Sequence, residues 1–361
     1  MHDFVVVGAG PAGSRFARRA AAAGHDVVAF ERGEVGEPLA CSGHVSTDIW
    51  DFTPEGARDR LLQNEVTGAR FHVGGPDSEG HRFYKDEAVS NVIDRVGLDR
   101  ELADAAREAG ADVRDHHRVV GVSEGRDRVT VDVKGPDGTE THEARMVVGC
   151  DGPNSRVRQE LGLPDPDELL HGVLGFDPDP DHQDHVDVHL TVPRFFAWRI
   201  PRGEAGVEYG LAVPPGDDVR AAFDSFVEDY DATVDRRCSG LIPVGPPKRV
   251  TGRRSFLVGD AAAQTKPFTG GGILYGMTAA DHAVETIDPT DPGTLGDYER
   301  AWREDLRTEI RLGHAVRAAY SLPEPVQRAG LAALSGELGV HMDRPSTLFS
   351  REGLRALLTR S

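Results

Sequence analysis

The sequence predicts an α/β protein, α+β overall, with a parallel-sheet domain, an inserted antiparallel sheet and a C-terminal helical tail. Three observations predict this class. A continuous apolar run at residues 3–7 leads into a glycine-rich turn and an alanine-rich helix. Two later apolar runs, at residues 145–148 and 255–258, also end in glycine turns, as parallel strands covered on both faces do. Between these runs the chain alternates in polarity, which is typical of strands covered on one face.

Composition narrows the classes of function. The 361 residues carry 41 Lys+Arg and 60 Asp+Glu, a net charge of −19, which argues against nucleic-acid binding because that needs a basic surface. No run approaches the roughly 20 apolar residues of a membrane-spanning helix. The three cysteines are too few for a disulfide framework or a four-cysteine iron–sulfur site, and glycines interrupt the first apolar run. We therefore expect no signal peptide and a location in the reducing cytoplasm.

Lysine is scarce in this chain. Only Lys85, Lys134, Lys248 and Lys266 occur, so the other 37 of the 41 basic residues are arginine. With the acidic surplus, this predicts the salt-accumulating cytoplasm of an archaeal halophile. An ordinary acidic protein from a GC-rich genome is the alternative, and unfolding on dialysis into low salt distinguishes the two.

The first thirty residues predict a dinucleotide site. In the turn GAGPAG, Gly8 allows a tight turn, Gly10 lets a pyrophosphate approach the backbone, and Gly13 lets the next helix pack close to the sheet. The N-terminus of that helix presents its positive dipole end to the phosphates. Glu31 ends the second strand, residues 26–30, where an acid accepts the ribose hydroxyls. A glycine-rich turn without a ligand is the alternative.

Two later segments distinguish among dinucleotides. Residues 149–158 are GCDGPNSRVR, and residues 259–273 begin with GDAA and end with PFTGGGI. Here the chain resembles the flavoprotein superfamily of the glutathione-reductase and aromatic-hydroxylase type, which includes the geranylgeranyl reductases. The resemblance implies FAD as the cofactor and places Asp260 on its ribityl chain. It also places a helix N-terminus near the pyrophosphate and the flavin pyrimidine edge, formed by Gly271, Gly272 and Ile273.

Further segments resemble the geranylgeranyl reductase family itself. Residues 38–43, PLACSG, are similar to its PxxCxG loop. Residues 196–201, FAWRIP, followed by YGLA at 209–212, are similar to its YxWxFP and VGxG segments. Residues 240–247, GLIPVGPP, lead into the later motif as they do in the family, so the resemblance covers residue 1 to about residue 300.

The departures from the family pattern fall in one segment. Phe196, Ile200, Tyr209 and Ala212 stand where the family has Tyr, Phe, Val and Gly. In the family this segment shapes the substrate cavity, so the departures bear on the identity of the substrate and leave the flavin site unchanged.

The resemblance implies an FAD-dependent oxidoreductase acting on CH–CH groups. Hydride from N5 of the reduced flavin adds to an isolated double bond of a polyprenyl lipid, and a protein acid adds the proton. Cys41 is the candidate acid, His44 is the alternative donor, and a buried, inert Cys41 is a further alternative. The same resemblance assigns the remaining cofactor contacts to Glu31, Arg32, Cys41, Ser42, Arg95 and Val119, and the substrate contacts to Phe196, Trp198 and Pro201. A surface arginine that caps a helix is the alternative for Arg95, and a core aromatic is the alternative for Trp198.

The domain organisation follows from these motifs. We expect a discontinuous FAD-binding domain (1–50, 91–165 and 250–300), an antiparallel-sheet substrate domain (51–90 and 166–249) and a C-terminal helical region (301–361). The predicted strands include a hairpin at residues 67–73 and 80–84 and further strands at 91–95, 112–114, 184–192, 195–200 and 207–213. Leu98 and Leu102 predict a helix that Gly110 ends. The adjacent His116 and His117 are expected on opposite faces of a strand, so we predict no metal site there.

The tail from Arg300 to Ser361 holds ten arginines and seven acids. Trp302, Leu306 and Ile310 stand at helical spacing, which predicts a helix resting on the FAD domain. A patch that contacts anionic lipid at the inner face of the membrane is the alternative.

Two other functions are alternatives to a reductase: an FAD-dependent monooxygenase of the aromatic-hydroxylase type, and a flavin electron carrier. The 38–43 loop and the Trp198 segment favour the reductase. Because the chain has no second GxGxxG turn, it lacks a separate nicotinamide domain. Electrons are therefore expected from ferredoxin, NAD(P)H or a reductase partner.

Overall fold

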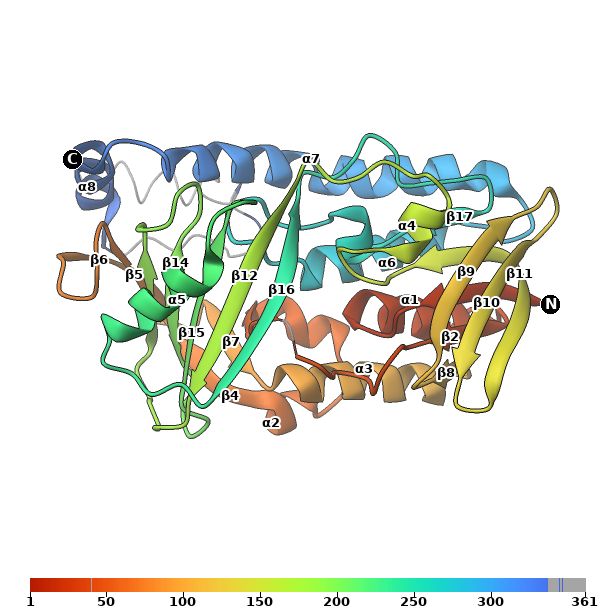
Figure 1. The fold of residues 1–361 in the computed structure, drawn as a ribbon, viewed down its shortest axis with the longest axis horizontal. Coiled ribbons are helices and arrows are strands. Elements are labelled where there is room, and N and C mark those ends of the chain that lie inside the picture. The colour runs from red at the N-terminus through yellow and green to blue at the C-terminus, as the bar shows by residue number, and fades with distance from the viewer. Residues whose placement is uncertain (40, 337–343, 345, 347–361) are drawn as a thin grey trace.

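The protein is described by a computed structural model, which covers residues 1–39, 41–336, 344 and 346. It is elongated, with a parallel sheet towards one end, a large antiparallel sheet towards the other, and one long helix along both (Figure 1). The α/β class predicted from the sequence is confirmed. The predicted region 301–361 is described as far as residue 336, and most of its remainder lies outside the described residues.

The first sheet holds the N-terminal strand at its centre. Its order is β8-β2-β1-β11-β10-β9, with β17 also paired to β11. Its strands are β1 (His2–Val7), β2 (Val27–Phe30), β8 (Asp112–Arg114), β9 (Arg118–Glu124), β10 (Val129–Gly135), β11 (Gly138–Gly149) and β17 (Ser255–Leu257). β1, β2, β8, β11 and β17 pair in parallel, whereas β9 and β10 continue β11 as an antiparallel meander. The carboxyl ends of the parallel strands thus share one edge, where an α/β fold places its ligand.

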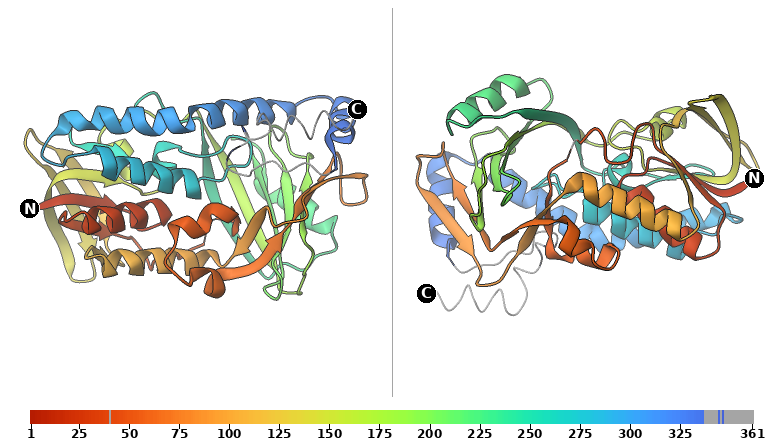
Figure 2. Two further views of the ribbon diagram at one scale, coloured as in Figure 1. Left: turned by 180° about the vertical axis from the view of Figure 1, so that it is seen from behind. Right: turned by 90° about the horizontal axis from the view of Figure 1, so that it is seen from below.

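A layer of helices packs on this sheet. α3 (Arg95–Glu108), α1 (Pro11–Ala22), α6 (Ile273–Thr286) and α7 (Leu295–Ala319) lie side by side in that order (Figure 2). Trp302 and Leu306 of α7 are 1% and 2% exposed and belong to the same core as β1. The helix predicted to rest on the FAD domain is therefore confirmed. It is followed by α8 (Glu324–Leu334). Within the described residues, no helix has both the length and the apolar character needed to cross a bilayer.

The second sheet has the order β16-β12-β15-β14-β13-β5-β6. Its strands are β5 (Gly68–His72), β6 (Gly80–Tyr84), β12 (Glu168–Asp177), β13 (His185–His189), β14 (Ala197–Pro201), β15 (Val207–Val213) and β16 (Arg236–Val244). β5 and β6 form the predicted antiparallel hairpin, but β5 pairs with β13 in parallel. α5 (Val219–Glu228) lies on this sheet with Phe223 and Phe226 buried.

The chain also forms a small third sheet. It consists of β3 (His44–Ser46), β7 (Ser90–Ile93) and β4 (Leu62–Val66), in that order. The strand predicted at residues 91–95 is β7. The remaining short elements are α2 (Ala57–Leu61), α4 (Arg156–Glu160) and the 3-10 turns at Thr47–Phe52, Gly259–Ala262 and Pro292–Thr294.

The prediction that His116 and His117 lie on a strand is wrong. Both follow β8 and precede β9, and His116 has a φ of 57°. Their backbone N–H groups donate to Gly33 O and Glu31 O. The segment therefore turns to follow the loop after β2 instead of extending a sheet.

Candidate functional site

Two helices begin side by side at the carboxyl edge of the parallel sheet. α1 starts after Gly10 and α6 after Gly272, and neither N-terminus has a side-chain cap. Arg15 of α1 donates from Nε and Nη2 to both oxygens of Asp281 in α6, at 2.7 and 2.8 Å. This pair fixes the two helices against each other, and their uncapped N-termini form a site for an anion with more than one phosphate.

The three glycines of the first turn differ in their surroundings. A Cβ at Gly8, whose φ is +97°, would lie 2.4 Å from Cys150 O, and one at Gly13 would lie 2.0 Å from Gly8 O. A Cβ at Gly10 would meet nothing within 4 Å. Gly8 and Gly13 are therefore required by the turn and by helix–strand packing, whereas Gly10 borders open space at the start of α1, as a pyrophosphate cradle requires.

Glu31 lies at the end of β2 next to this turn. Its Oε2 accepts from Ala9 N and its Oε1 from Arg32 N, both at 2.9 Å. The Arg32 side chain is exposed, and Val119, at the start of β9, is 6% exposed. His117 N donates to Glu31 O, so the start of β9 and the end of β2 are adjacent. The structure thus brings Glu31, Arg32 and Val119 to one side of the turn.

Three distant segments meet at a second group of residues, formed by Cys41, Arg95, Asp99 and Asp260. Arg95 is 7% exposed, so the alternative of a surface arginine is wrong. Its Nη1 lies 2.6 Å from Asp99 Oδ1, and its Nε has no hydrogen-bond partner among the described residues. A buried guanidinium with an unpartnered N–H beside the helix N-termini fits a polar cofactor group. Sequence reasoning missed Asp99, although its i,i+4 spacing from Arg95 on one helix is a signal for such a pair.

Asp260 lies beside the N-terminus of α6. A Cβ at Gly272 would be 2.5 Å from its Oδ1, so Gly272 is needed for this approach. Burial raises the pKa of Asp260 to about 6, and the nearby Arg95 opposes that rise. Burial also raises the pKa of the Cys41 thiol, and the positive charge of Arg95 again opposes the rise. Cys41 is therefore a protonated thiol at neutral pH, and Asp260 is largely ionised.

His44 and Ser42 are engaged with their neighbours. His44 Nε2 lies 2.7 Å from Ser90 Oγ, and its backbone N donates to Ser42 Oγ. The Cys41 Sγ lies 3.5 Å from Ser42 O. Of the two candidate proton donors, Cys41 is the one in electrostatic contact with both Arg95 and Asp260.

Asp260 makes the stability of the apoprotein depend on pH. Its pKa of about 6 in the folded chain lies above the ordinary value of 3.8, so the folded state binds this proton more tightly than the unfolded state. Stability from this group is complete below pH 4 and falls as the pH rises through 6, by about 1–3 kcal/mol. We expect Asp260→Asn to remove that fall in urea unfolding between pH 4.5 and 7. Equal pH slopes in the two proteins would contradict this assignment.

The predicted substrate residues lie on or just before β14. Phe196 stacks on Phe195 with ring centroids 4.5 Å apart, and a Cβ at Gly270 would be 3.3 Å from the Phe195 ring. The Trp198 ring lies 5.6 Å from that of Phe196. The Phe195 ring therefore adjoins the glycine turn before α6, and it links that turn to Phe196 and Trp198. Pro201 ends the same strand, and its carbonyl accepts from Asn64.

Trp198 also has a structural role that the sequence did not show. Its Nε1 donates to Glu208 Oε1 at 3.0 Å, and Glu208 is 1% exposed. A Cβ at the cross-strand residue Gly210 would lie 2.3 Å from the indole. The glycine of the YGLA segment thus makes room for the indole, which is only partly available to a ligand.

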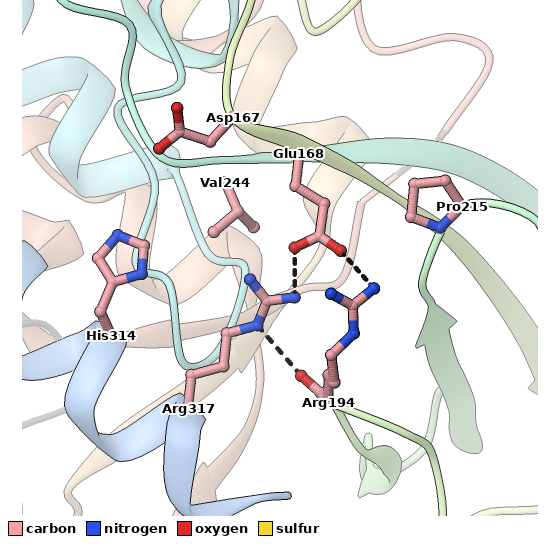
Figure 3. A pocket seen from close by; sticks show the side chains of 7 residues that line it. All are labelled: Asp167, Glu168, Arg194, Pro215, Val244, His314 and Arg317. Atoms are coloured by element: carbon pink, nitrogen blue, oxygen red, sulfur yellow. Dashed lines mark hydrogen bonds and ion pairs between the residues drawn. The ribbon is translucent and has the colours of Figure 1, made fainter.

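Two surface clefts lie near the elements described above. One, of about 480 Å³, lies between α7 and the second sheet, and there Glu168 binds both Arg194 and Arg317 (Figure 3). Its charges are thus largely paired with one another. The other cleft, of about 460 Å³, is partly lined by Arg95 and the 37–39 loop, so it adjoins the group around Cys41.

Comparisons with known proteins identify the family of the chain. The family model described as "FAD binding domain" matches residues 1–199. Digeranylgeranylglycerophospholipid reductase 1 of Methanopyrus kandleri is 33% identical over 350 residues, covering 89% of this chain and 91% of that protein. The corresponding reductase of Methanothrix thermoacetophila is 32% identical, covering 85% and 84%.

Solved structures share the fold. A geranylgeranyl bacteriochlorophyll reductase-like protein from Thermoplasma acidophilum superposes with a TM-score of 0.84 at 24% identity, covering 99% and 98% of the two chains. The p-nitrophenol 4-monooxygenase of Pseudomonas putida gives 0.73 at 18% identity, covering 99% and 96%. The glycine turn, the paired helix N-termini and the unpartnered Arg95 Nε fit FAD. The chain belongs to the digeranylgeranylglycerophospholipid reductase family of FAD-dependent oxidoreductases.

Proposed function

We propose that the protein saturates isolated double bonds in the geranylgeranyl chains of a glycerophospholipid. The observation that carries the proposal is the half-buried, protonated Cys41 thiol, held beside Arg95 and Asp260 at the edge where the helix N-termini meet. An isolated alkene has no carbonyl to polarise, so its reduction needs an acid positioned at the second carbon. The names of the relatives support the choice of substrate.

The residues of the chain have distinct parts in this scheme. Gly10 and the N-termini of α1 and α6 would hold the pyrophosphate of FAD, Glu31 its ribose, and Asp260 its ribityl chain. When reduced, FAD supplies the hydride. Cys41 holds the proton at Sγ and transfers it to the alkene carbon that does not receive the hydride, so the double bond gains two hydrogens. Phe196 and Trp198 would position the prenyl chain and exclude water.

The proposal is tested with reduced enzyme under anaerobic conditions. Protein reduced with dithionite and mixed with a geranylgeranyl glycerophospholipid should yield a product heavier by two mass units for each double bond. A monooxygenase would instead consume oxygen and NADPH with an aromatic substrate. Absence of any mass gain, with unchanged lipids in a deletion strain, would exclude the reductase function.

We also propose that electrons come from ferredoxin or NAD(P)H. The absence of a second GxGxxG turn supports an external donor. Anaerobic bleaching of the flavin, measured with each candidate in turn, identifies the electron donor.

We also propose the expected division into an FAD domain (1–50, 91–165, 250–300), a substrate domain (51–90, 166–249) and a helical region (301–361).

We propose a cytoplasmic location with peripheral contact to the inner face of the membrane, supported by exposed apolar side chains near the end of the described chain. Val316, Leu322, Val326 and Leu334 are 37–51% exposed on α7, α8 and the turn between them. We expect Val326→Asp to weaken co-sedimentation with anionic liposomes by about tenfold. Ala221→Asp, which adds the same charge on α5, is the control and should bind like the wild type. Equal binding of all three proteins would remove α8 from this proposal.

The acidic surplus and the four lysines support a further proposal, that the protein works in the salt-rich cytoplasm of an archaeal halophile. Loss of the folded state on dialysis into low salt is the expected result, and indifference to salt would contradict it.

A further inference from the structure

The cleft of about 460 Å³ has a charge arrangement that the proposed reaction does not explain. It lies between the start of α3, the 37–39 loop, the carboxyl ends of β12 and β14, and the start of β16. The Phe176 ring in this cleft is contacted by two guanidinium groups, that of Arg202 at 4.7 Å and that of Arg236 at 4.8 Å from its centroid. Phe176 and Arg236 are cross-strand partners, so their side chains share one face of the sheet.

Neither arginine forms an ion pair in the part of the chain that the structure describes. Arg202 donates from Nε and Nη2 to Gln63 Oε1, a neutral group, at 3.1 and 3.0 Å. This is unusual in a chain with 60 acidic residues against 41 basic ones. Burial lowers the pKa of Arg202, the negative charge of Glu208 opposes this shift, and the positive charge of Arg236 adds to it against a smaller effect of Asp94. A bound anion would relieve the repulsion between the two guanidinium groups.

The acidic side chains of the cleft are either occupied or exposed. Asp94 caps α3 by accepting from Val96 N and Gly97 N, and Asp177 accepts from Asp179 N and Thr233 N. Glu37 and Asp235 are exposed at the rim, where water screens them. The cationic groups are thus the ones left to bind a ligand.

The cleft adjoins both parts of the candidate active site. Arg95, which lies beside Cys41, is one of its lining residues. On the other side, the carboxylate of Glu208 interacts with the charge of Arg202. The same carboxylate accepts a hydrogen bond from the Trp198 indole. A ligand anchored at Arg202 and Arg236 would therefore have its remainder next to the thiol and the aromatic side chains.

We propose that this cleft binds the phosphate end of the prenyl lipid, with the guanidinium groups of Arg202 and Arg236 as its ligands. The inference rests on the proposed function, because it assigns a place to the polar end of that substrate. Guanidinium groups bind phosphate oxygens through paired, charge-assisted hydrogen bonds, which suits this chemistry. The cleft thereby fixes which end of the lipid enters towards Cys41.

The test uses Arg236→Gln in the FAD-loaded protein, since Arg236 is exposed and the change keeps the strand intact. Arg237→Gln is the matched control, because Arg237 is the next residue of β16, contacts Phe223 instead of Phe176 and pairs with Asp224. We expect Arg236→Gln to lower kcat/KM for geranylgeranyl diphosphate by about 10- to 100-fold. Its kcat/KM for uncharged geranylgeraniol should stay within about twofold of the wild type, and Arg237→Gln should leave both values unchanged.

A second measurement is independent of turnover. Calorimetric titration with inorganic pyrophosphate should show binding to the wild type and to Arg237→Gln, and weaker binding to Arg236→Gln. An Arg236→Gln protein that keeps the wild-type preference for the diphosphate overturns the inference. If it loses pyrophosphate binding but keeps that preference, the cleft takes a free anion and the lipid assignment is wrong. A wild type that reduces neither prenyl compound nor the phospholipid, while still binding pyrophosphate through Arg236, would instead contradict the proposed function.

Discussion

Gly10→Val is expected to give a folded, colourless protein whose affinity for FAD is about 100-fold weaker than that of the wild type. The backbone at Gly10 has φ −71° and ψ −172°, an extended conformation that any residue adopts. The new side chain would meet no protein atom within 4 Å of its Cβ, so the apoprotein should fold normally. It would instead occupy the open space at the start of α1, where the pyrophosphate approaches the backbone.

The measurement is a titration of apoprotein with FAD, followed by quenching of flavin fluorescence, together with a thermal unfolding curve. Gly296→Val is the control, because a Cβ at Gly296 also meets nothing within 4 Å but lies in the first turn of α7. It should bind FAD like the wild type. A yellow Gly10→Val protein with unchanged affinity would show that the cofactor does not lie in this turn.

Cys41→Ala is expected to lower the rate of alkene reduction by about 10²- to 10⁴-fold, the usual contribution of a general acid. Burial keeps the Cys41 thiol protonated, and alanine cannot donate a proton. The variant should still bind FAD, and dithionite should still reduce it, so the rate of the alkene step can be measured separately. The measurement is a single-turnover experiment in which reoxidation of the reduced flavin by the prenyl substrate is followed without oxygen.

His44→Gln separates the two candidate donors. The His44 ring already contacts Ser90 Oγ at 2.7 Å, so we expect its loss to slow the reaction by less than about tenfold. If Cys41→Ala reacts at the wild-type rate while His44→Gln does not, the proton comes from His44. If both react normally, solvent or another group supplies the proton and Cys41 is a packing residue.

The local elements were predictable because their signals lie within a few residues of each other. Gly8 has a positive φ and Gly13 packs against Gly8 O, both inside one strand–turn–helix unit, and alternating polarity placed the β5–β6 hairpin and β15. The strand predicted at His116 from its neighbours in sequence is absent. The backbone turns there because His116 N donates to Gly33 O, in a loop some eighty residues earlier in the chain.

The sequence by itself determined the nucleotide turn, the acid at Glu31, the main strands and the helix around Trp302, since each depends on local periodicity or on backbone sterics. Only the tertiary structure decided that Arg95 is buried and that Asp99 pairs with it. It also decided that Cys41 and Asp260 both lie close enough to Arg95 to interact with its positive charge. The tertiary structure alone also placed two arginines on one phenylalanine ring. The pKa of a buried group depends on burial and on charges that other segments bring within a few ångströms, and spacing along the chain does not specify those distances.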